Sequence, residues 1–489
     1  MICAVVKGPT WEVAHVQIEE ALVYADLIEL RLDCFFTLDL TSIKKLRSLF
    51  AIPMIFTLRS SLEGGSYQGS EDLRLKNIHL LASLEPEYLD LESFIPAYFI
   101  ESILSRHPKV KLIISYHNFK ETPEDLDYVY ENMQKIPAYF YKIAVMAHSG
   151  VDALRLLQLV RKASKKLIGV SMGEYGQFTR IIAPILGSAI TYGSLQEKEC
   201  SLGQFTIKTL MTRYRVPSLT ENTAIYALLG DPVDGSISDI THNRFFASFG
   251  LNAVYVKIRV RACELTSFLS LLHGLPFLGF SITMPLKEVI IPFLDGKAPE
   301  VKKIKAANTL VVEEGKLLGF NTDGIGALDA IEKTGSIKGK RVLVLGAGGA
   351  SRAIVFEAVK RGAFITIFNR STEKAKALSE QFGCLYKDLE SLSALEESFE
   401  ILINTTSIEM TSFFDFMRQD VLVMDIRTKP KETPFLVEAK KRGCLTLYGY
   451  EMFALQAMYQ FSLWFKCLMK KDLIQDSFNL IVKEVIFDS

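Results

Sequence analysis

The feature that most constrains the fold of this chain is an aliphatic run that ends in glycines, Val342-Leu-Val-Leu-Gly-Ala-Gly-Gly-Ala-Ser-Arg-Ala353. The aliphatic part is typical of a buried parallel strand, and Arg352 to Arg361 has a helix-compatible composition. Gly346 permits a tight turn between the two, and Gly348 and Gly349 let the backbone approach a phosphate without a Cβ in the way. The stretch therefore predicts a strand–turn–helix unit whose first helical amides hold a dinucleotide pyrophosphate.

The next segment favours NADP over NAD. Ala350 belongs to the predicted phosphate-binding turn, whereas Ser351 stands where the usual fingerprint has its third glycine. Phe364–Phe368 is predicted to be the next strand, and it ends at Asn369 and Arg370, about 20 residues beyond the glycines. An NAD site usually has a carboxylate there for the ribose hydroxyl. The amide and guanidinium of this chain suit a 2′-phosphate instead, so we expect NADP(H).

Length and composition are those of a multidomain globular protein. The 489 residues suggest about three domains, and an apolar content of 49% suffices for large cores. Lys+Arg and Asp+Glu number 56 each, so the charge balance does not indicate a nucleic acid or an anionic membrane as partner. Seven scattered cysteines without CxxC spacing favour free thiols in a reducing compartment over a disulfide or metal framework. The scattered cysteines also give no reason to expect a metal site. We expect a cytoplasmic protein, because no apolar run could span a bilayer and no signal peptide is evident.

The first two hundred residues alternate short apolar runs with longer helical segments. The runs predict eight strands, at Cys3–Lys7, Leu27–Asp33, Met54–Arg59, Tyr88–Glu92, Lys111–His117, Tyr139–Val145, Leu167–Met172 and Ala189–Ser194. Eight such units are what a closed (βα)8 barrel requires. One helix start is marked by Thr122 as a cap and Pro123 at the first helical position.

Polar residues fall at the carboxyl ends of these strands, where a barrel of this kind carries its chemistry. They are Glu29, Arg31, Asp33, Arg59, Glu92 and His117, with Lys142 inside the sixth strand. Any one of them, taken singly, is more typical of a residue at the barrel rim in a surface ion pair. A lysine in an otherwise apolar strand is different, because burial disfavours its charge and leaves a neutral amine able to attack a carbonyl. His117 is the natural proton shuttle for such an imine site.

These residues resemble type I 3-dehydroquinate dehydratase over about residues 1–210. The matching motifs are Glu29-Leu-Arg-Leu-Asp33, Asp90-Leu-Glu92, Ser115-Tyr-His-Asn-Phe119, Tyr141-Lys-Ile-Ala-Val-Met146, Ser171-Met-Gly173 and Gly203-Gln204. The resemblance implies that Lys142 forms an imine with the ketone, while His117 removes a proton and assists the loss of water.

The same resemblance implies roles for other residues. Glu92 would orient His117, and the substrate contacts would be Glu29, Arg31, Arg59, Arg180 and Gln204. The segment Gly193 to Gly203 departs from the family pattern, because Cys200 replaces the usual serine and leaves Ser201 as the alternative.

A second α/β pattern begins after the polar segment Ser218 to Thr223. It contains hydroxyls, amides, Lys287 and Asp323 ahead of the predicted nucleotide domain. A carboxylated polyol would suit such side chains, and a lysine–aspartate pair suits proton transfer in a hydride reaction.

The order of these motifs is similar to shikimate dehydrogenase from about residue 224 to the end. The resemblance implies that Lys287 and Asp323 act on the substrate, with further contacts from Ser236, Ser238, Thr283, Asn308 and Gln456. It adds Thr405 and Gly449 to the cofactor contacts and returns the apolar helix Met452–Met469 to the substrate domain. Asp425-Ile-Arg-Thr-Lys-Pro430 departs from the family, because Thr428 replaces the usual tyrosine.

Together the resemblances predict an α/β protein with a (βα)8 barrel followed by a two-domain dehydrogenase with a Rossmann NADP-binding domain. We expect the barrel at 1–212, the substrate-binding domain at 223–325 completed by 449–489, and the nucleotide domain at 326–448. The implied function is consecutive dehydration of 3-dehydroquinate and NADPH-dependent reduction of 3-dehydroshikimate. Two alternatives remain at this point: a dehydrogenase that also uses quinate, and a regulatory protein that senses the metabolites without catalysis.

Overall fold

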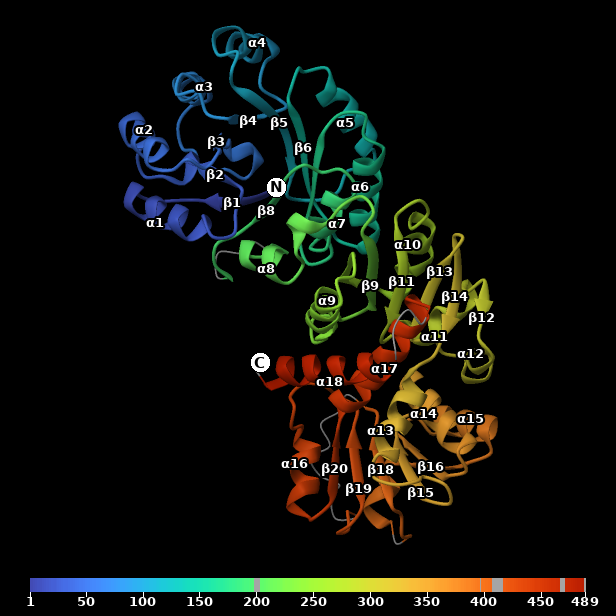
Figure 1. The fold of residues 1–489 in the computed structure, drawn as a ribbon. Helices are drawn as coiled ribbons and strands as arrows, with labels where there is room; N and C mark the ends of the chain where they lie inside the picture. Colours follow the sequence, from blue (N-terminus) through green and yellow to red (C-terminus); the bar gives the residue numbers. More distant parts are fainter. Residues whose placement is uncertain (198–202, 396, 407–416, 467–470, 488–489) are drawn as a thin grey trace. The chain divides into compact units, whose positions relative to one another are not determined.

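The computed structural model describes residues 1–197, 203–395, 397–406, 417–466 and 471–487 of the chain (Figure 1). The chain forms two compact units, Met1–Ala224 with Asn252–Leu275, and Ile225–Leu251 with Pro276–Ser489. Cys200 and Ser201, which bear on a predicted substrate contact, lie outside the described residues.

The first unit contains an eight-stranded parallel sheet in the order β7-β6-β5-β4-β3-β2-β1-β8. Its strands are β1 Ile2–Val6, β2 Leu27–Arg31, β3 Met54–Thr57, β4 Tyr88–Glu92, β5 Lys111–Asn118, β6 Phe140–Met146, β7 Leu167–Met172 and β8 Thr191–Gly193. Pairing of the last strand with the first is the closure that a barrel needs, and Cys3 stands opposite Tyr192 in that ladder. In the described part of the chain no ladder joins β7 to β8. The predicted (βα)8 architecture is confirmed, with one seam that backbone hydrogen bonds do not close.

Helices follow the strands around this sheet (Figure 1). They are α1 Trp11–Ala21, α2 Leu40–Leu49, α3 Glu71–Ala82, α4 Ala97–Arg106, α5 Leu126–Gln134, α6 Gly150–Lys162, α7 Thr179–Ile185 and α8 Ile207–Thr212. The predicted start of α5 at Thr122 and Pro123 is wrong. Asp125 caps the helix by accepting from the amide of Tyr128, whereas the hydroxyl of Thr122 donates to the carbonyl of Met146.

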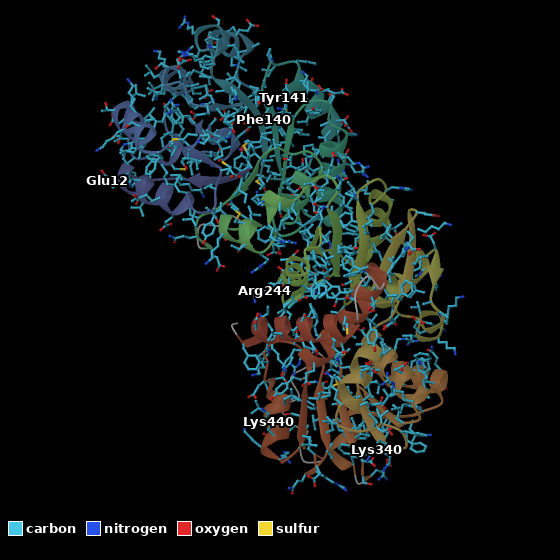
Figure 2. All side chains as sticks on the ribbon, in the orientation of Figure 1. Glu12, Phe140, Tyr141, Arg244, Lys340 and Lys440 are labelled. Carbon is cyan, nitrogen blue, oxygen red and sulfur yellow. The ribbon has the colours of Figure 1, made fainter. Side chains whose placement is uncertain are left out.

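Phe140 and Tyr141, labelled in Figure 2, are neighbours on β6 with different surroundings. Phe140 belongs to the buried cluster of the interior, together with Cys3, Ile113 and Tyr192. The hydroxyl of Tyr141 donates to the carbonyl of Ile136, which precedes the strand. Because side chains alternate along a strand, Lys142 points to the same side as Phe140.

The second sheet is mixed and has the strand order β10-β9-β11-β13-β14-β12. Its strands are β9 Ala224–Gly230, β10 Ala253–Arg259, β11 Phe277–Ile282, β12 Gly296–Lys297, β13 Thr309–Glu313 and β14 Lys316–Phe320. The helices of this region are α9 Ser238–Ser248, α10 Leu265–Leu271, α11 Leu286–Val289, α12 Pro299–Ile304 and α13 Asp323–Glu332.

The third sheet is parallel throughout, in the order β17-β16-β15-β18-β19-β20. Its strands are β15 Arg341–Leu345, β16 Phe364–Asn369, β17 Leu385–Asp388, β18 Ile401–Asn404, β19 Leu422–Asp425 and β20 Leu445–Tyr448. The helices are α14 Gly349–Lys360, α15 Thr372–Phe382, α16 Pro434–Lys441, α17 Gly449–Trp464 and α18 Lys471–Phe487. This strand order is that of the Rossmann fold, which places a dinucleotide at the carboxyl end of β15.

The long apolar helix α17 begins earlier than predicted, because Glu451 accepts from the backbone amide of Tyr448 just before the helix. Its far end packs on the second sheet: the amide of Gln460 donates to the carbonyl of Asn308, and the indole of Trp464 donates to that of Leu310. No described helix is both long and apolar enough to cross a membrane.

Candidate active sites

Lys142 lies in the barrel interior between two carboxylates. Its Nζ is 3.3 Å from Oδ2 of Asp90 and 3.6 Å from Oε1 of Glu29, and its side chain is 7% exposed. The ring of Tyr192 lies beside the same nitrogen, with its centroid 4.2 Å away. The burial of Lys142 in its strand is therefore combined with charged partners from β2 and β4.

His117 is paired with Glu63, a residue that the sequence did not single out. Nδ1 of His117 lies 2.8 Å from Oε2 of Glu63, and the backbone amide of His117 donates to the same oxygen at 3.1 Å. Burial, with the positive charges of Arg59 and Lys142, holds the pKa of His117 well below its ordinary value. The imidazole is therefore neutral near pH 7, as a proton acceptor must be.

The prediction that Glu92 orients His117 is wrong. Oε1 of Glu92 accepts from the backbone amide of Ser60 at 2.8 Å, and Oε2 accepts from Arg74 at 2.9 Å. Glu92 therefore holds the segment that follows β3. Glu63 takes the predicted role, because a 3-10 turn at Ser61–Glu63 brings its carboxylate to the carboxyl end of β5.

A buried ion network links the two halves of this site. Nη2 of Arg59 lies 2.8 Å from Oδ1 of Asp90, and its Nη1 donates to the hydroxyl of Ser115 at 2.8 Å. Burial raises the pKa of Asp90, but the charges of Arg59 and Lys142 outweigh it and hold that pKa below its ordinary value. Burial raises the pKa of Glu63 to about 8, because the Arg59 charge only partly compensates for the lost solvation.

The other predicted substrate contacts of the barrel have these partners. Arg31 forms two hydrogen bonds to Asp33, and Nε of Arg180 donates to the carbonyl of Gly203. Gln204 lies next to that carbonyl in sequence and is partly buried. Arg180, on α7, thus contacts the segment after β8 that contains Gln204, and the sequence signal for both residues was the family resemblance.

The sequence analysis did not single out two residues of the barrel site, Glu63 and Tyr192. Glu63 follows Arg59 by four residues and precedes Gly64 and Gly65, so a carboxylate beside a glycine pair marked the turn. Tyr192 gave no signal, because an aromatic residue in a strand is typical of any core.

Lys287 and Asp323 form the centre of the second site. Nζ of Lys287 lies 2.5 Å from Oδ2 of Asp323, and the two side chains are 18% and 6% exposed. The structure thus brings together the predicted pair from the start of α11 and the start of α13. A charge-assisted hydrogen bond of this length fixes the ammonium in one direction.

Amide side chains hold Asp323 in place. Nδ2 of Asn308 donates to Oδ1 of Asp323 at 2.8 Å, and Oδ1 of Asn321 accepts from the amide of Asp323 at 3.1 Å. Oε1 of Gln456 accepts from Asn308 at 3.3 Å and from the hydroxyl of Thr322 at 3.4 Å. Asn308 and Gln456, predicted as substrate contacts, therefore lie beside Asp323, and Asn308 holds its carboxylate in place.

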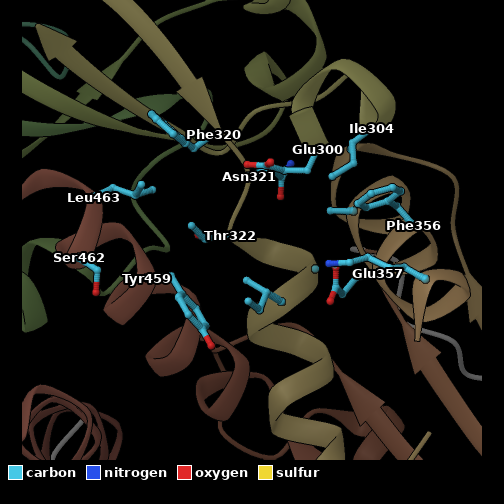
Figure 3. A pocket seen from close by; sticks show the side chains of 14 residues that line it. Glu300, Ile304, Phe320, Asn321, Thr322, Phe356, Glu357, Tyr459, Ser462 and Leu463 are labelled. Carbon is cyan, nitrogen blue, oxygen red and sulfur yellow. The ribbon is translucent and has the colours of Figure 1, made fainter. Parts of the chain in front are cut away.

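A cavity of about 400 Å³ lies on another side of the same segment (Figure 3). Its lining includes Phe320, Asn321, Thr322, Phe356 and Tyr459.

Ser236 and Ser238 lie together at the start of α9. Their hydroxyl oxygens are 2.9 Å apart, and the amide of Ser238 donates to the hydroxyl of Ser236. Thr283 follows β11, and its methyl group packs against Gly230. A Cβ on Gly230 would lie only 2.3 Å from that methyl group, so a larger residue would clash with Thr283. Paired hydroxyls at a helix start suit a carboxylate ligand.

The glycine loop has the backbone that a pyrophosphate requires. Gly346 has a φ of +113°, and a Cβ there would lie 2.4 Å from Oγ1 of Thr405. A Cβ on Gly348 would meet nothing within 4 Å, so the space beside the start of α14 is open. A Cβ on Gly349 would lie 2.9 Å from that of Lys287, which brings the loop next to the proton-transfer pair. The residues present fit a dinucleotide.

The residues after β16 fit the expected 2′-phosphate. Arg370 is exposed and forms no ion pair with any described residue, and Asn369 donates to the carbonyl of Ser371. Ser351, in the place of the third glycine, shares a 2.5 Å hydrogen bond with Thr405. The hydroxyl thus joins α14 to the segment after β18, where a glycine would leave a gap.

Gly449, a predicted cofactor contact, and Thr428, which replaces the usual tyrosine of the family, lie in the segments after β20 and β19. A Cβ on Gly449 would lie 2.2 Å from the carbonyl of Arg427, so α17 starts against the segment after β19. Thr428 is partly buried, and the side chain of its neighbour Arg427 folds back onto Asp425 at 2.7 Å. The described residues contain no group of side chains that could hold a metal ion.

Fold and sites define a barrel with a buried lysine beside a histidine–glutamate pair, joined to a dehydrogenase with a lysine–aspartate pair at a nucleotide loop. Three family models match the chain: type I 3-dehydroquinase over residues 2–221, the shikimate dehydrogenase substrate-binding domain over 228–310, and shikimate/quinate 5-dehydrogenase over 329–429.

Full-length relatives match as well. The shikimate biosynthesis protein AroDE of Chlamydia pneumoniae is 37% identical, over 99% of each chain. The chloroplastic bifunctional 3-dehydroquinate dehydratase/shikimate dehydrogenase of Arabidopsis thaliana is 35% identical, over 95% of this chain and 82% of its own. The NADP(+) shikimate dehydrogenase of Pyrococcus furiosus is 40% identical over 50% of this chain and 90% of its own. The chain belongs to the family of bifunctional 3-dehydroquinate dehydratase/shikimate dehydrogenases.

Proposed function

We propose that this chain catalyses two consecutive steps: dehydration of 3-dehydroquinate to 3-dehydroshikimate in the barrel, and reduction of 3-dehydroshikimate to shikimate in the second unit. Family membership over the full length supports both steps. The observation that carries the first is Lys142 beside the His117–Glu63 pair, and the observation that carries the second is the Lys287–Asp323 pair next to the glycine loop.

In the barrel, Nζ of Lys142 attacks the ketone carbon as a neutral amine. The carbonyl oxygen leaves as water with the two amine protons and one further proton returns to the nitrogen, so that a protonated imine remains. Asp90 and Glu29, at 3.3 Å and 3.6 Å, are within reach of the proton that the ammonium loses first.

His117 then removes a proton from the carbon next to the imine, and the electron pair moves to nitrogen. The neighbouring hydroxyl leaves with a proton that His117 returns, and water hydrolyses the imine to release the enone and Lys142. Glu63 keeps the ring in place through Nδ1, so that the other nitrogen faces the substrate. Arg31, Arg59, Arg180 and Gln204 are the proposed contacts for the ring substituents.

In the second unit, bound NADPH supplies a hydride to the carbonyl carbon. Lys287 donates a proton to the carbonyl oxygen, and Asp323 directs the ammonium at that oxygen. Ser236 and Ser238 hold the carboxylate, and Thr283, Asn308 and Gln456 contact the ring hydroxyls.

Gly346, Gly348, Gly349 and Ala350 form the cradle for the cofactor pyrophosphate, with Thr405 and Gly449 beside it. Asn369 and Arg370 hold the 2′-phosphate. Two observations support NADP over NAD: the exposed guanidinium of Arg370, which forms no ion pair with a described residue, and the NADP(+) in the name of the Pyrococcus relative.

We assign the barrel to 1–212, the substrate domain to 223–325 with 449–489, and the nucleotide domain to 326–448. The five described cysteines are free thiols, which suits the reducing cytoplasm.

One assay tests the whole proposal. Purified protein given 3-dehydroquinate and NADPH should oxidise NADPH, which requires both sites, and should release shikimate. If NADPH is consumed only when 3-dehydroshikimate is supplied, the barrel assignment is wrong; no consumption from either substrate contradicts the reductase assignment.

A further inference from the structure

Tyr192 lies at the reacting nitrogen of the barrel site. It stands on β8 and belongs to the buried interior cluster, where it is 4% exposed. Its ring centroid is 4.2 Å from Nζ of Lys142. The same nitrogen has the carboxylates of Asp90 and Glu29 as partners. The nitrogen is thus bounded by two carboxylates and one aromatic face.

The hydroxyl of Tyr192 is not what anchors this residue. It is buried and has no hydrogen-bond partner among the described residues. Buried hydroxyls normally find a partner, so the position of Tyr192 is set by the ring and its packing. Removing the hydroxyl breaks no hydrogen bond to any described residue, so a phenylalanine variant tests the contribution of the ring.

An aromatic face attracts a cation, and the attraction grows when water is excluded. In the proposed reaction the nitrogen of Lys142 is positive as the resting ammonium and again as the protonated imine. In the second state that charge draws electrons from the neighbouring carbon while His117 removes the proton. A ring that stays against the nitrogen lowers the energy of this cationic intermediate.

We propose that the ring of Tyr192 stabilises the cationic nitrogen of Lys142 during dehydration and holds it toward the substrate ketone. The proposal rests on the imine mechanism above and assigns Tyr192 a role that needs only its aromatic face. The covalent steps are unchanged: the imine forms with release of one water, and Tyr192 neither gains nor loses a proton.

The experiment compares Tyr192→Leu with Tyr192→Phe in the full-length protein. Tyr192→Leu should lower the dehydratase kcat by about 10-fold with little change in KM, because an aromatic contact to a desolvated cation is lost. Borohydride added during turnover should then trap less imine on Lys142. Tyr192→Phe should keep kcat within about 2-fold and trap imine normally. Reductase activity, which depends on the second unit, measures the concentration of folded protein in each sample.

Tyr88→Leu is the matched control. Tyr88 belongs to the same interior cluster and is 9% exposed, but its ring lies by Lys111, at 5.6 Å, instead of Lys142. It should lose a comparable amount of packing while keeping kcat and imine trapping.

Each outcome decides the proposal. It is overturned if Tyr192→Leu retains kcat and trapping, if Tyr88→Leu loses as much, or if Tyr192→Phe falls as far as Tyr192→Leu. A failure of the proposed function has a different signature: the unchanged protein dehydrates its substrate, yet borohydride leaves no adduct on Lys142.

Discussion

At the scale of single residues, the barrel site is a set of charges whose states depend on one another. Lys142 is paired with Asp90 and Glu29, and Arg59 with Asp90, so four charged groups share a space almost without water. Removing any one of them weakens the charge compensation of its partners, and a buried charge left without compensation costs several kcal/mol. Activity measurements on variants of this network therefore need a fold control, and the reductase of the same chain provides it.

The imine at Lys142 gives the first prediction. Borohydride added during turnover should inactivate only the dehydratase and leave a substrate-derived mass on the peptide that carries Lys142. Lys142→Ala should abolish both labelling and dehydration, because no other amine replaces the nucleophile. His117→Ala should still label while turning over about 10²–10⁴-fold more slowly. Lys111→Ala, on the neighbouring strand, is the control that should label normally; an adduct on any lysine other than Lys142 contradicts the mechanism.

Glu63 gives a prediction of stability against pH. Its pKa is about 8 in the folded protein, whereas an exposed glutamate has its ordinary value of 4.5. Between these values the folded state keeps a proton that the unfolded state loses, so this group lowers stability as the pH rises. Glu63→Gln removes that dependence. The free energy of unfolding of the variant relative to wild type should therefore increase by about 3 kcal/mol from pH 5 to pH 8.

The measurement is denaturant unfolding of the barrel at both pH values, with dehydratase kcat in parallel. The kcat of Glu63→Gln should fall, because the carboxyl group that holds His117 through Nδ1 and the backbone amide is replaced by an amide. A relative stability that is constant with pH would show that Glu63 ionises normally in the folded protein.

Arg370 gives the third prediction at this scale. Arg370→Ala should weaken NADPH far more than NADH, because a charge-assisted pair to a phosphate contributes about 1.5–3 kcal/mol. KM values for both cofactors measure the difference. Arg341→Ala is the control, since this exposed arginine lies at the opposite end of β15. Equal loss for the two cofactors would contradict the 2′-phosphate role.

At the scale of elements, two short glycine segments position the chemistry. After β3, a Cβ on Gly65 would lie 2.0 Å from the carbonyl of Arg59, and one on Gly64 would lie 2.5 Å from the ring of Phe119. Only glycines allow this turn to fold so tightly, and the turn carries Glu63 to His117. After β15, the glycine loop does the same for the cofactor and Lys287.

The loop after β15 gives a prediction that separates backbone strain from ligand contact. Gly346→Ala should destabilise the second unit by about 1–3 kcal/mol, because its φ of +113° and the nearby Thr405 leave no place for a Cβ. Gly348→Ala should leave stability unchanged but raise the KM for NADPH, because its Cβ would fill only open space beside the loop. Thermal unfolding and cofactor KM measure the two effects, and a stable Gly346→Ala would contradict the described turn.

At the scale of the whole molecule, the two sites are chemically independent. The residues proposed for dehydration all lie in the first unit, and those proposed for reduction all lie in the second.

The independence of the sites gives the last prediction. Lys287→Ala should lower the reductase kcat by about 10²–10⁴-fold and leave dehydratase turnover unchanged. A mixture of Lys287→Ala and Lys142→Ala proteins should convert 3-dehydroquinate and NADPH to shikimate, because each supplies the site that the other lacks. The NADPH assay measures this. No turnover in the mixture, with both single activities intact, would mean that the intermediate does not pass through solution.

The sequence by itself determined the architecture and the main reactive side chains of both sites. Alternating apolar runs located each barrel strand to within a few residues, because side-chain periodicity is a local property. The glycine loop and the NADP-type segment after β16 were equally local. Lys142, His117, Lys287 and Asp323 stood out since each is a reactive group where chemistry or a motif requires one.

Only the tertiary structure decided which groups meet. Glu92 and Glu63 both follow barrel strands, and the sequence favoured Glu92, but the turn after β3 brings Glu63 to His117 and leaves Glu92 with Arg74. The charged surroundings of Lys142 likewise come from β2 and β4, which are distant in sequence. Contacts of this kind depend on strand stagger, loop path and close packing of the interior, and these are properties of the folded chain that no local pattern encodes.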